Sequence, residues 1–504
     1  MKSISDIFFE NVKKYSEKTA IICDGEFLSY KELASLINKW SNLLISNDVK
    51  YGEHIGVLLP NDINFVSLIL ASANIGAAIV PLNPTLPPSA IEKAFDFADV
   101  KHIIGFSSSL ETLNLKKLPK VNGLLLSIDE EVEGFKSFKK LFKKTKNIQI
   151  NTSNISGDEP LILTMTSGST GEPKPIVLTQ KNKIDRAFTA CSLYSVTESD
   201  KILAATPLYH SLAERLILMP LLVGATSVLM PRFSPSVWLE CIKEQKITFT
   251  IAVSSQLSQI AELIKEQDAS DINSLRCIVS SSALLQDDVK LKLLSGLECD
   301  IHECYGTSEV AIVTNLNLFD SKSKLKTVGK AIPDVDVKIL KEDKSFADLN
   351  EPGEIICKTP MLFAGYYKLD DLTKKSMFGE YFCTGDIGKL DENGFLTYLE
   401  RKKDLIITGG INVYPKDIEE VVLKFPNVKE CAAVSFPDEK LGETVAVVLL
   451  AEDNQEINLR ELKFHCAKYL ADFQQPRKYF VMEKFPKTGM GKLRKHALVE
   501  ELKT

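Results

Sequence analysis

The sequence lacks the features that mark several large classes of protein. Its ten cysteines form no C-x-x-C pair and no zinc-binding spacing, so a zinc site is not indicated. Several of them, such as Cys357, lie in apolar runs, which is typical of a reducing compartment where cysteine acts as a small hydrophobic residue. The net charge of -6 provides no general attraction to nucleic acid or to an anionic membrane.

Long hydrophobic runs are also missing. The longest apolar stretch, residues 65–80, contains serine and asparagine and is too short to cross a bilayer. Residues 1–10 lack the apolar core of a signal peptide and instead predict the start of an amphipathic helix. We therefore expect a cytoplasmic protein without a transmembrane segment and without a nucleic-acid partner.

The chain is long enough for at least two globular domains. It has 504 residues, of which 44% are hydrophobic and 25% are charged. Short β-branched runs alternate with helical patterns, which predicts an α/β protein with parallel sheets covered by helices. Antiparallel strands are expected from about residue 335, and the last 100 or so residues predict a small α+β domain. The predicted strands are 56–60, 78–81, 201–205, 226–230, 249–253, 276–280, 336–340 and 353–357, and a helix is predicted over 65–77.

A glycine-rich segment at residues 161–175 is the strongest motif. An apolar strand leads into a loop in which Gly168 and Gly171 let backbone N–H groups approach a ligand closely. Ser167, Ser169, Thr170 and Lys174 add hydroxyl groups and a positive charge, and such a set suits a polyphosphate. A flexible serine/glycine linker is the alternative, but it would not require the preceding strand. The Walker A pattern is absent, which excludes a Walker-type ATPase.

Two further motifs combine polar groups with glycine. Residues 305–309, Tyr-Gly-Thr-Ser-Glu, place an aromatic ring, two hydroxyls and a carboxylate together, a set suited to a base, a phosphate and a hard cation. A simple polar turn is the alternative. In the second motif, Asp386 follows a glycine, and its carboxylate is able to accept hydrogen bonds from the two hydroxyls of a ribose.

These motifs occur in the order and spacing of a known group of enzymes. The run 166–174, Thr-Ser-Gly-Ser-Thr-Gly-Glu-Pro-Lys, resembles the phosphate-loop signature of the acyl-adenylate-forming superfamily, and the resemblance covers nearly the whole chain. That superfamily includes acyl-CoA synthetases, adenylation domains of peptide synthetases and firefly luciferase. The resemblance implies that Tyr305 stacks on adenine, Ser308 contacts the α-phosphate and Glu309 binds Mg²⁺. The residues it places around ATP are Thr166, Ser167, Gly168, Ser169, Thr170, Gly171, Lys174, Ser282, Ala283, Tyr305, Gly306, Thr307, Ser308, Asp386 and Arg401.

The C-terminal motifs imply a mobile domain. Lys492 follows a glycine in the run 486–494 and resembles the family's catalytic lysine, with Lys487, Arg494 and Lys495 as competing candidates. Gly409 and Gly410 resemble the segment along which the pantetheine arm of CoA passes. The resemblance places a hinge at Lys403. We therefore expect a large domain at 1–401 and a small mobile domain at 402–504.

The acid pocket is the least determined part of the sequence. His210 resembles the residue that gates the acid site in CoA ligases, although a packed core imidazole is the alternative. His302 and His465 have no motif and are predicted to be structural. Members that activate amino acids carry an aspartate near this point, and here only Glu214 is close, so we expect an acid without an amino group. Ser254 and the run Ser280–Leu285 depart from the usual proline and Gly-Gly-Ala-Pro patterns, and Pro175 replaces a usual glycine.

The resemblance implies an ATP- and Mg²⁺-dependent ligase. It would convert a fatty or aryl carboxylic acid to its acyl-AMP and transfer the acyl group to CoA. The main alternative is a free-standing enzyme that loads an acyl or peptidyl carrier protein, since both thiols belong to the same phosphopantetheine arm. A luciferase-type oxygenase is remote, and a nucleotide-binding regulator without catalysis disagrees with the presence of both Glu309 and Lys492. The sequence does not distinguish a monomer from a homodimer.

Overall fold

In the computed structural model the chain forms two compact units. The first unit contains residues 1–325, 332–335 and 359–377, and the second contains 326–331, 336–358 and 378–504. The residues described are 2–152, 154–167, 173–266, 272–408, 411–438, 441–453, 455–487 and 493–502.

One sheet of the first unit has the strand order β7-β6-β5-β3-β4-β8-β9. Its strands run parallel except for the antiparallel hairpin of β8 and β9. The strands are β3 (His54–Leu58), β4 (Ala78–Pro81), β5 (Val100–Gly105), β6 (Leu125–Ser127), β7 (Lys136–Ser137), β8 (Pro160–Ser167) and β9 (Pro173–Thr179). The helices that follow its strands or precede the sheet are α2 (Tyr30–Ser46), α3 (Ile63–Ile75), α4 (Pro88–Phe97), α5 (Ser107–Leu110) and α6 (Phe138–Lys144).

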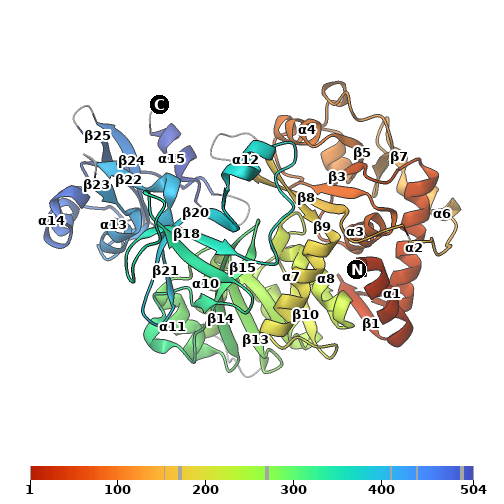
Figure 1. The fold of residues 1–504 in the computed structure, drawn as a ribbon, viewed down its shortest axis with the longest axis horizontal. Helices are drawn as coiled ribbons and strands as arrows, with labels where there is room; N and C mark the ends of the chain where they lie inside the picture. Colours follow the sequence, from red (N-terminus) through yellow and green to blue (C-terminus); the bar gives the residue numbers. More distant parts are fainter. Residues whose placement is uncertain are drawn as a thin grey trace. The chain divides into compact units, whose positions relative to one another are not determined.

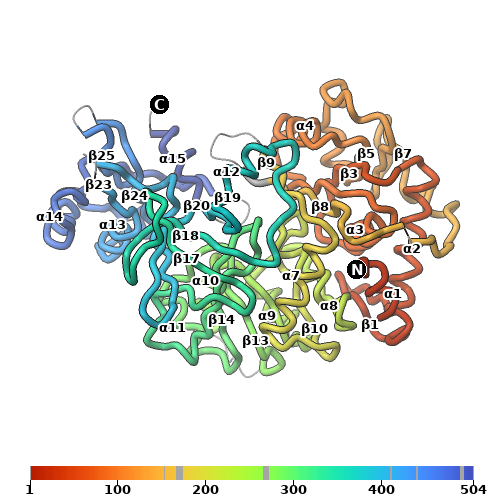
Figure 2. Tube along the Cα trace, in the orientation of Figure 1, coloured from red at the N-terminus to blue at the C-terminus, as the bar shows by residue number. Residues whose placement is uncertain are grey.

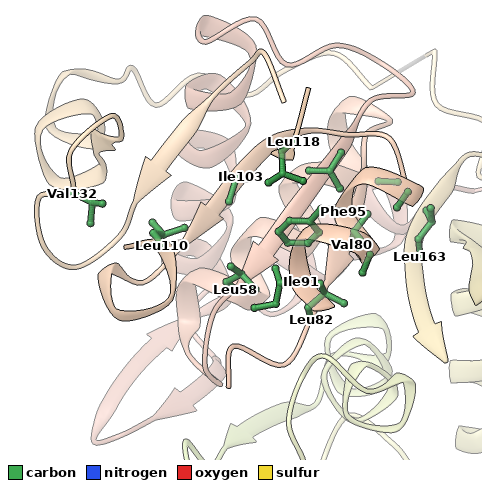
Figure 3. Close-up of a cluster of buried hydrophobic side chains, with 14 residues drawn as sticks. Leu58, Val80, Leu82, Ile91, Phe95, Ile103, Leu110, Leu118, Val132 and Leu163 are labelled. Carbon is green, nitrogen blue, oxygen red and sulfur yellow. The ribbon is translucent and has the colours of Figure 1, made fainter. Parts of the chain in front are cut away.

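A hydrophobic core lies between this sheet and α4. Phe95 of α4 is fully buried among Leu58, Val80 and Ile103 (Figure 3). Gly56 of β3 is necessary here, because an added Cβ would lie 2.7 Å from the Phe95 ring. The absence of a side chain at that position therefore lets the helix approach the sheet.

The other sheet of the first unit supplies the ends of several strands to the candidate site. Strands β1, β11, β10, β12, β13 and β14 are parallel neighbours in that order, with β2 and β15 antiparallel at the two ends. They are β1 (Thr19–Cys23), β2 (Glu26–Ser29), β10 (Lys201–Ala204), β11 (Thr226–Leu229), β12 (Phe249–Val253), β13 (Cys277–Ser281), β14 (Asp300–Thr307) and β15 (Ala311–Asn317). The accompanying helices are α1 (Ile4–Lys14), α7 (Gln180–Leu193), α8 (Ser211–Val223), α9 (Pro235–Gln245), α10 (Ser254–Glu266) and α11 (Asp287–Gly296). Helix α12 (Asp370–Lys375) follows residues 364–367, which contact β9 of the other sheet. Helices α7 and α8 lie side by side (Figure 1).

The second unit contains two β regions. The first is formed by β17 (Asp336–Leu340), β18 (Gly353–Lys358), β20 (Tyr381–Leu390) and β21 (Leu396–Arg401). The second is formed by β22 (Ile406–Thr408), β23 (Ile411–Val413), β24 (Val428–Asp438), β25 (Gly442–Ala451) and β26 (Lys478–Val481), with helices α13 (Pro415–Val422), α14 (Leu459–Tyr469) and α15 (Lys495–Glu501). The strands of both regions pair antiparallel except that β26 runs parallel to β25. Two hydrophobic clusters are drawn entirely from residues 406–502, so this C-terminal portion has a core of its own.

The fold class predicted from the sequence is confirmed, and so are the predicted strands. The strands at 78–81 and 249–253 have the predicted bounds. The helix predicted over 65–77 is α3, which begins earlier because Asp62 caps it through the Phe65 N–H at 2.7 Å and ends before Gly76, whose φ is 68°. Among the described residues, no helix has both the length and the apolar character needed to cross a membrane.

Candidate active site

The backbone that carries Glu309 is fixed by a buried arginine. Arg186 of α7 is 2% exposed and donates hydrogen bonds to three carbonyl oxygens, those of Ser308 at 2.9 Å, Glu309 at 2.8 Å and Met361 at 2.9 Å. The Phe363 N–H donates to the same Glu309 carbonyl at 2.8 Å. The segment after β14 is therefore held in one conformation by contacts that are distant in sequence.

The Glu309 carboxylate is half-buried and is oriented by a tyrosine. The Tyr366 hydroxyl donates to Glu309 Oε1 at 2.9 Å. A carboxylate that keeps its second oxygen for another ligand fits Mg²⁺, which usually takes one or two carboxylates together with phosphate and water oxygens. Among the described residues, no cluster of three or more His, Cys, Asp and Glu is placed to hold a metal ion.

The segment that contains Tyr366 also contacts the phosphate-loop hairpin. The Tyr367 N–H donates to the Pro175 carbonyl at 2.9 Å, and the Val177 N–H donates to the Gly365 carbonyl at 3.0 Å. Figure 2 shows this segment, in teal, passing beside β9. The structure thus brings the hairpin that carries Lys174 close to Glu309, as a nucleotide site would require.

The hairpin itself is only partly described. Thr166 of β8 faces Lys174 of β9 in the ladder, and Lys174 is half-buried. Pro175 takes a regular place in the ladder opposite Met165, so its departure from the family pattern does not interrupt the strand. The predicted residues Gly168, Ser169, Thr170 and Gly171, and the side chains of Thr166 and Ser167, lie outside the described residues.

The backbone at the end of β14 shows why the Tyr-Gly-Thr-Ser-Glu motif has a glycine at position 306. The Tyr305 side chain is 9% exposed, and a bulge separates its pairing from that of Gly306. An added Cβ on Gly306 would lie 1.7 Å from the Ala311 carbonyl oxygen. Thr307 contributes its hydroxyl as acceptor for the Glu309 N–H at 3.3 Å. The motif therefore consists of the bulged end of β14 and of Ser308 and Glu309 in the turn that joins β14 to β15.

The loop after β13 carries the serines that depart from the family pattern. Ser282 has a φ of 77°, a left-handed conformation that glycine would adopt without steric cost. Ser282 and Ala283 are exposed, and the Ser254 hydroxyl donates to the Ala283 carbonyl. The serine at the position of the usual proline therefore anchors the loop by a hydrogen bond.

A buried ion pair fixes the far end of the same loop. Glu303 of β14 accepts from the Leu285 N–H at 2.8 Å and pairs with Lys290 of α11 at 2.6 Å, and both ionic side chains are nearly inaccessible. Because Glu303 lies two residues before Tyr305, this pair connects the loop after β13 to the strand that carries the nucleotide motif.

His210 lies at the N-terminal cap position of α8. Burial lowers the pKa of His210 to about 4, so the imidazole is neutral near pH 7. Its Nε2 is buried and has no hydrogen-bond partner among the described residues. The preceding loop is held by Asn61, whose amide donates to the Thr206 carbonyl at 2.9 Å and accepts from the Leu208 N–H at 2.7 Å.

The other two histidines considered in the sequence have structural contacts. His302 Nδ1 lies 3.0 Å from the Asn315 amide nitrogen, and His465 Nε2 lies 3.0 Å from the Val421 carbonyl oxygen. Each contact holds the imidazole against a neighbouring element of its own unit, in keeping with a structural role.

In the second unit, the predicted ribose residues form a cross-strand pair. Asp386 of β20 lies opposite Arg401 of β21, and the Arg401 Nε is 2.9 Å from Asp386 Oδ1. The Asp386 side chain is almost wholly buried. Lys403 follows in a short exposed 3-10 helix, Lys402–Asp404.

The two lysines that compete with Lys492 are both engaged in ion pairs. Lys487 pairs with Glu430 at 2.6 Å, and Lys495 of α15 pairs with Glu419 at 2.9 Å and Glu400 at 3.3 Å. These pairs give both lysines a structural role. The predicted residues Lys492, Gly409 and Gly410 lie outside the described residues.

Sequence reasoning missed Arg186, Tyr366 and Asn61. None of them belongs to a local motif. A basic residue on the buried side of the helix at 180–193 is the one signal that would have drawn attention to Arg186.

The parallel sheets, the phosphate-loop hairpin and the oriented Glu309 carboxylate together define a class of nucleotide-dependent enzymes. Comparison with known proteins identifies the family within that class. The AMP-binding enzyme family matches residues 8–367, and the AMP-binding enzyme C-terminal domain matches residues 417–492. The chain therefore belongs to the AMP-binding enzyme family.

Relatives match along nearly their whole length. A long-chain-fatty-acid–CoA ligase of Mycobacterium tuberculosis is 27% identical, covering 94% of this chain and 93% of the relative. A 2-succinylbenzoate–CoA ligase of Listeria monocytogenes is also 27% identical, covering 97% and 98%. Among solved structures, o-succinylbenzoate CoA synthetase from Bacillus subtilis with its acyl-adenylate intermediate has a TM-score of 0.86 and 26% identity, covering 98% of this chain and 97% of that chain.

Proposed function

We propose that this protein is an AMP-forming acid–CoA ligase. In the first step a carboxylate oxygen of the acid attacks the α-phosphorus of ATP, giving acyl-AMP and pyrophosphate. In the second step the thiol of CoA attacks the acyl carbon, giving the thioester and AMP. The observation that carries the proposal is the Glu309 carboxylate, held by Tyr366 beside the phosphate-loop hairpin, within a chain whose relatives are named CoA ligases.

The residues of the chain have separate roles in the first step. Tyr305, Ser282 and Ala283 line the adenine side, Ser308 meets the α-phosphate, and Asp386 with Arg401 holds the ribose. Lys174 and Lys492 contribute positive potential where charge builds up in the transition state, which is the main source of catalysis in phosphoryl-group chemistry. Glu309 would hold Mg²⁺, which when bound neutralises phosphate charge.

The acid pocket follows from the surroundings of His210. A neutral imidazole with a buried and unpaired Nε2 suits a pocket that excludes water, and Asn61 keeps its loop in place. The acid is of the fatty or aryl type and carries no amino group, because the aspartate of amino-acid-activating members is missing.

The second step is assigned to the C-terminal portion. Residues 402–504 form the mobile domain, Lys403 is the hinge, and Gly409 and Gly410 line the path of the pantetheine arm. The separate hydrophobic core within residues 406–502 supports this division, because a portion with its own core is able to move as a body.

A pyrophosphate-release assay tests the function. The full-length enzyme is incubated with ATP, Mg²⁺ and a panel of carboxylic acids, with CoA, with a phosphopantetheinylated carrier protein, or with neither. We expect pyrophosphate release that depends on the acid and that continues over multiple turnovers when CoA is present. Turnover with the carrier protein but not with CoA would show that the acceptor thiol belongs to a carrier protein. If no acid caused pyrophosphate release, the proposed adenylation would be wrong.

A further inference from the structure

The interface of α7 and α8 contains four buried charged side chains. Lys183 and Arg186 come from α7, and Glu214 and Arg215 come from α8. Their exposed fractions are 4%, 2%, 0% and 9%. Three cations thus share a buried region with one anion, an arrangement that costs free energy unless each charge has a partner.

Two of the three cations are fully accounted for. Lys183 forms an ion pair with Glu214. Arg186 is satisfied by the carbonyl oxygens of Ser308, Glu309 and Met361. Both side chains therefore have structural roles, and neither is available to a ligand.

Arg215 has no such partner. Within the described part of the chain its guanidinium makes no hydrogen bond and no ion pair, and its Nε is buried without an acceptor. Glu214 precedes it directly, but adjacent helical residues point in different directions, and Glu214 is already engaged by Lys183. An almost fully buried arginine with five donors and no acceptor is complementary to a planar anion.

The unpaired charge of Arg215 affects the pKa of the two neighbouring cations, Arg186 and Lys183. Burial lowers the pKa of Arg186 to about 9, and the nearby Arg215 charge contributes to that shift. Burial likewise lowers the pKa of Lys183 to about 8, against the opposing effect of Glu214. An anion beside Arg215 would offset this excess of positive charge.

Arg215 lies near β14, the strand that carries the nucleotide motif. Its charge acts on the Tyr194 phenol and the Cys304 thiol, and Cys304 directly precedes Tyr305 at the end of β14. Cys304 in turn contacts Ser281 at the end of β13. His210, the predicted gate, lies five residues earlier at the start of the same helix. Ligands of parallel sheets bind at these carboxyl ends of the strands.

We propose that Arg215 binds a second carboxylate of the acid that the enzyme activates, so that the substrate is a dicarboxylic acid and not a simple fatty acid. This inference rests on the proposed function and refines it. One carboxylate of the acid reacts with ATP, and the other forms paired, charge-assisted hydrogen bonds with the guanidinium, which fixes the orientation of the substrate.

The test compares acids that differ only in the second carboxylate. Pairs such as hexanoate with adipate, and benzoate with each benzenedicarboxylate, are assayed by pyrophosphate release with the full-length enzyme. We expect the preferred dicarboxylate to exceed its monocarboxylate partner at least tenfold in kcat/KM. Arg215→Met should reduce that ratio at least tenfold, with the loss falling on the dicarboxylate, and Arg215→Lys should give an intermediate ratio because the paired geometry is lost.

The control and the contradicting results are separate from those of the proposed function. Arg232→Met changes an exposed arginine in the same way and should keep the wild-type ratio. Thermal unfolding establishes that each variant is folded. If the wild type activates monocarboxylates at least as well throughout, or if Arg215→Met lowers both members of a pair equally, the inference is wrong while the ligase function stands. If no acid releases pyrophosphate, the proposed ligase function is wrong, and calorimetry of dicarboxylate binding in the presence of AMP tests the inference by itself. Binding by the wild type that Arg215→Met abolishes supports the inference. A wild type that binds no dicarboxylate contradicts it.

Discussion

At the scale of single residues, the site depends on how one carboxylate is held. Tyr366 donates to one oxygen of Glu309, which orients the group and leaves the other oxygen for a ligand. Removing the hydroxyl should loosen this orientation without removing the charge. Removing the charge should have a larger effect, because a hard cation requires an anionic oxygen.

We expect Glu309→Gln to lose most Mg²⁺-dependent activity. Tyr366→Phe should raise the Mg²⁺ concentration needed for half-maximal rate by a few-fold, in line with one lost hydrogen bond to a charged group. Titration of pyrophosphate release with Mg²⁺ measures both. Tyr367→Phe is the matched control, since its hydroxyl donates to Asp99 and not to Glu309. An unchanged Mg²⁺ titration of Glu309→Gln would remove Glu309 from the metal site.

At the scale of elements, the bulged end of β14 sets the spacing of the nucleotide motif. Gly306→Ala would place a methyl group against the Ala311 carbonyl, and we expect a loss of about 1–3 kcal/mol in the free energy of unfolding. Gly25→Ala is the comparison, because its φ is 77° but no atom lies within 4 Å of an added Cβ, so only the backbone cost of about 1 kcal/mol remains. Urea unfolding measures both, and an equal loss would show that the close approach at Gly306 is relieved by movement of β15.

Substitutions in the two C-terminal segments should affect acyl-AMP formation and thioester formation separately. Lys492→Ala should abolish acyl-AMP formation by a factor of tens or more while ATP still binds. Gly410→Leu should block thioester formation and leave acyl-AMP formation largely intact, since a side chain would obstruct the pantetheine path. Lys403→Pro should resemble Gly410→Leu because a restricted φ hinders rotation at the hinge.

Single-turnover formation of acyl-AMP, followed by addition of CoA, distinguishes these variants. Lys487→Ala provides a control, because that lysine is paired with Glu430 on the surface of the same portion of the chain. If Gly410→Leu lost both steps equally, or lost neither, a division of the chemistry between two poses would be wrong.

At the scale of the whole molecule, stability should depend on pH through Glu53. Hydrogen bonds from Lys101 and His102 lower the pKa of Glu53 to about 2, against the opposing effect of burial. His102 Nδ1 accepts from the Leu124 N–H at 2.8 Å, so its Nε2 carries the proton donated to Glu53. A carboxylate with a lowered pKa stabilises the folded state above its unfolded pKa and loses that contribution as the pH falls.

We therefore expect wild type to exceed Glu53→Gln in stability by about 1–2 kcal/mol at pH 7, after allowance for solvent screening. The difference should shrink as the pH falls from about 4.5 to 2, the interval between the ordinary and the shifted pKa of Glu53. Thermal unfolding of both proteins across this range provides the measurement. A difference that stayed constant with pH would show that Glu53 acts through packing and not through its charge.

The sequence predicted those parts of the molecule that depend on local pattern. The buried strand at 249–253 and the strand that leads into the glycine-rich loop follow from apolar runs rich in β-branched residues. The pairing of that strand with β9 in a hairpin was not predicted. Tyr366 and Arg186 were not predicted, because they contact Glu309 and Ser308 across 57 and 122 positions of the chain, a distance at which no local pattern carries information. The charge surplus at Arg215 also became visible only when α7 and α8 were placed together.

The Arg186 contacts have a consequence for the thermodynamics of nucleotide binding. Three carbonyl oxygens are held by a side chain of the protein itself, so the ordering entropy of the Glu309 segment is incurred during folding. Association with the nucleotide is then opposed mainly by the loss of translational and rotational freedom, and the enthalpy of phosphate contacts is retained in the affinity. The Glu309 segment is thus preorganised: it adapts less to different ligands, but it has the binding geometry before the nucleotide contacts form.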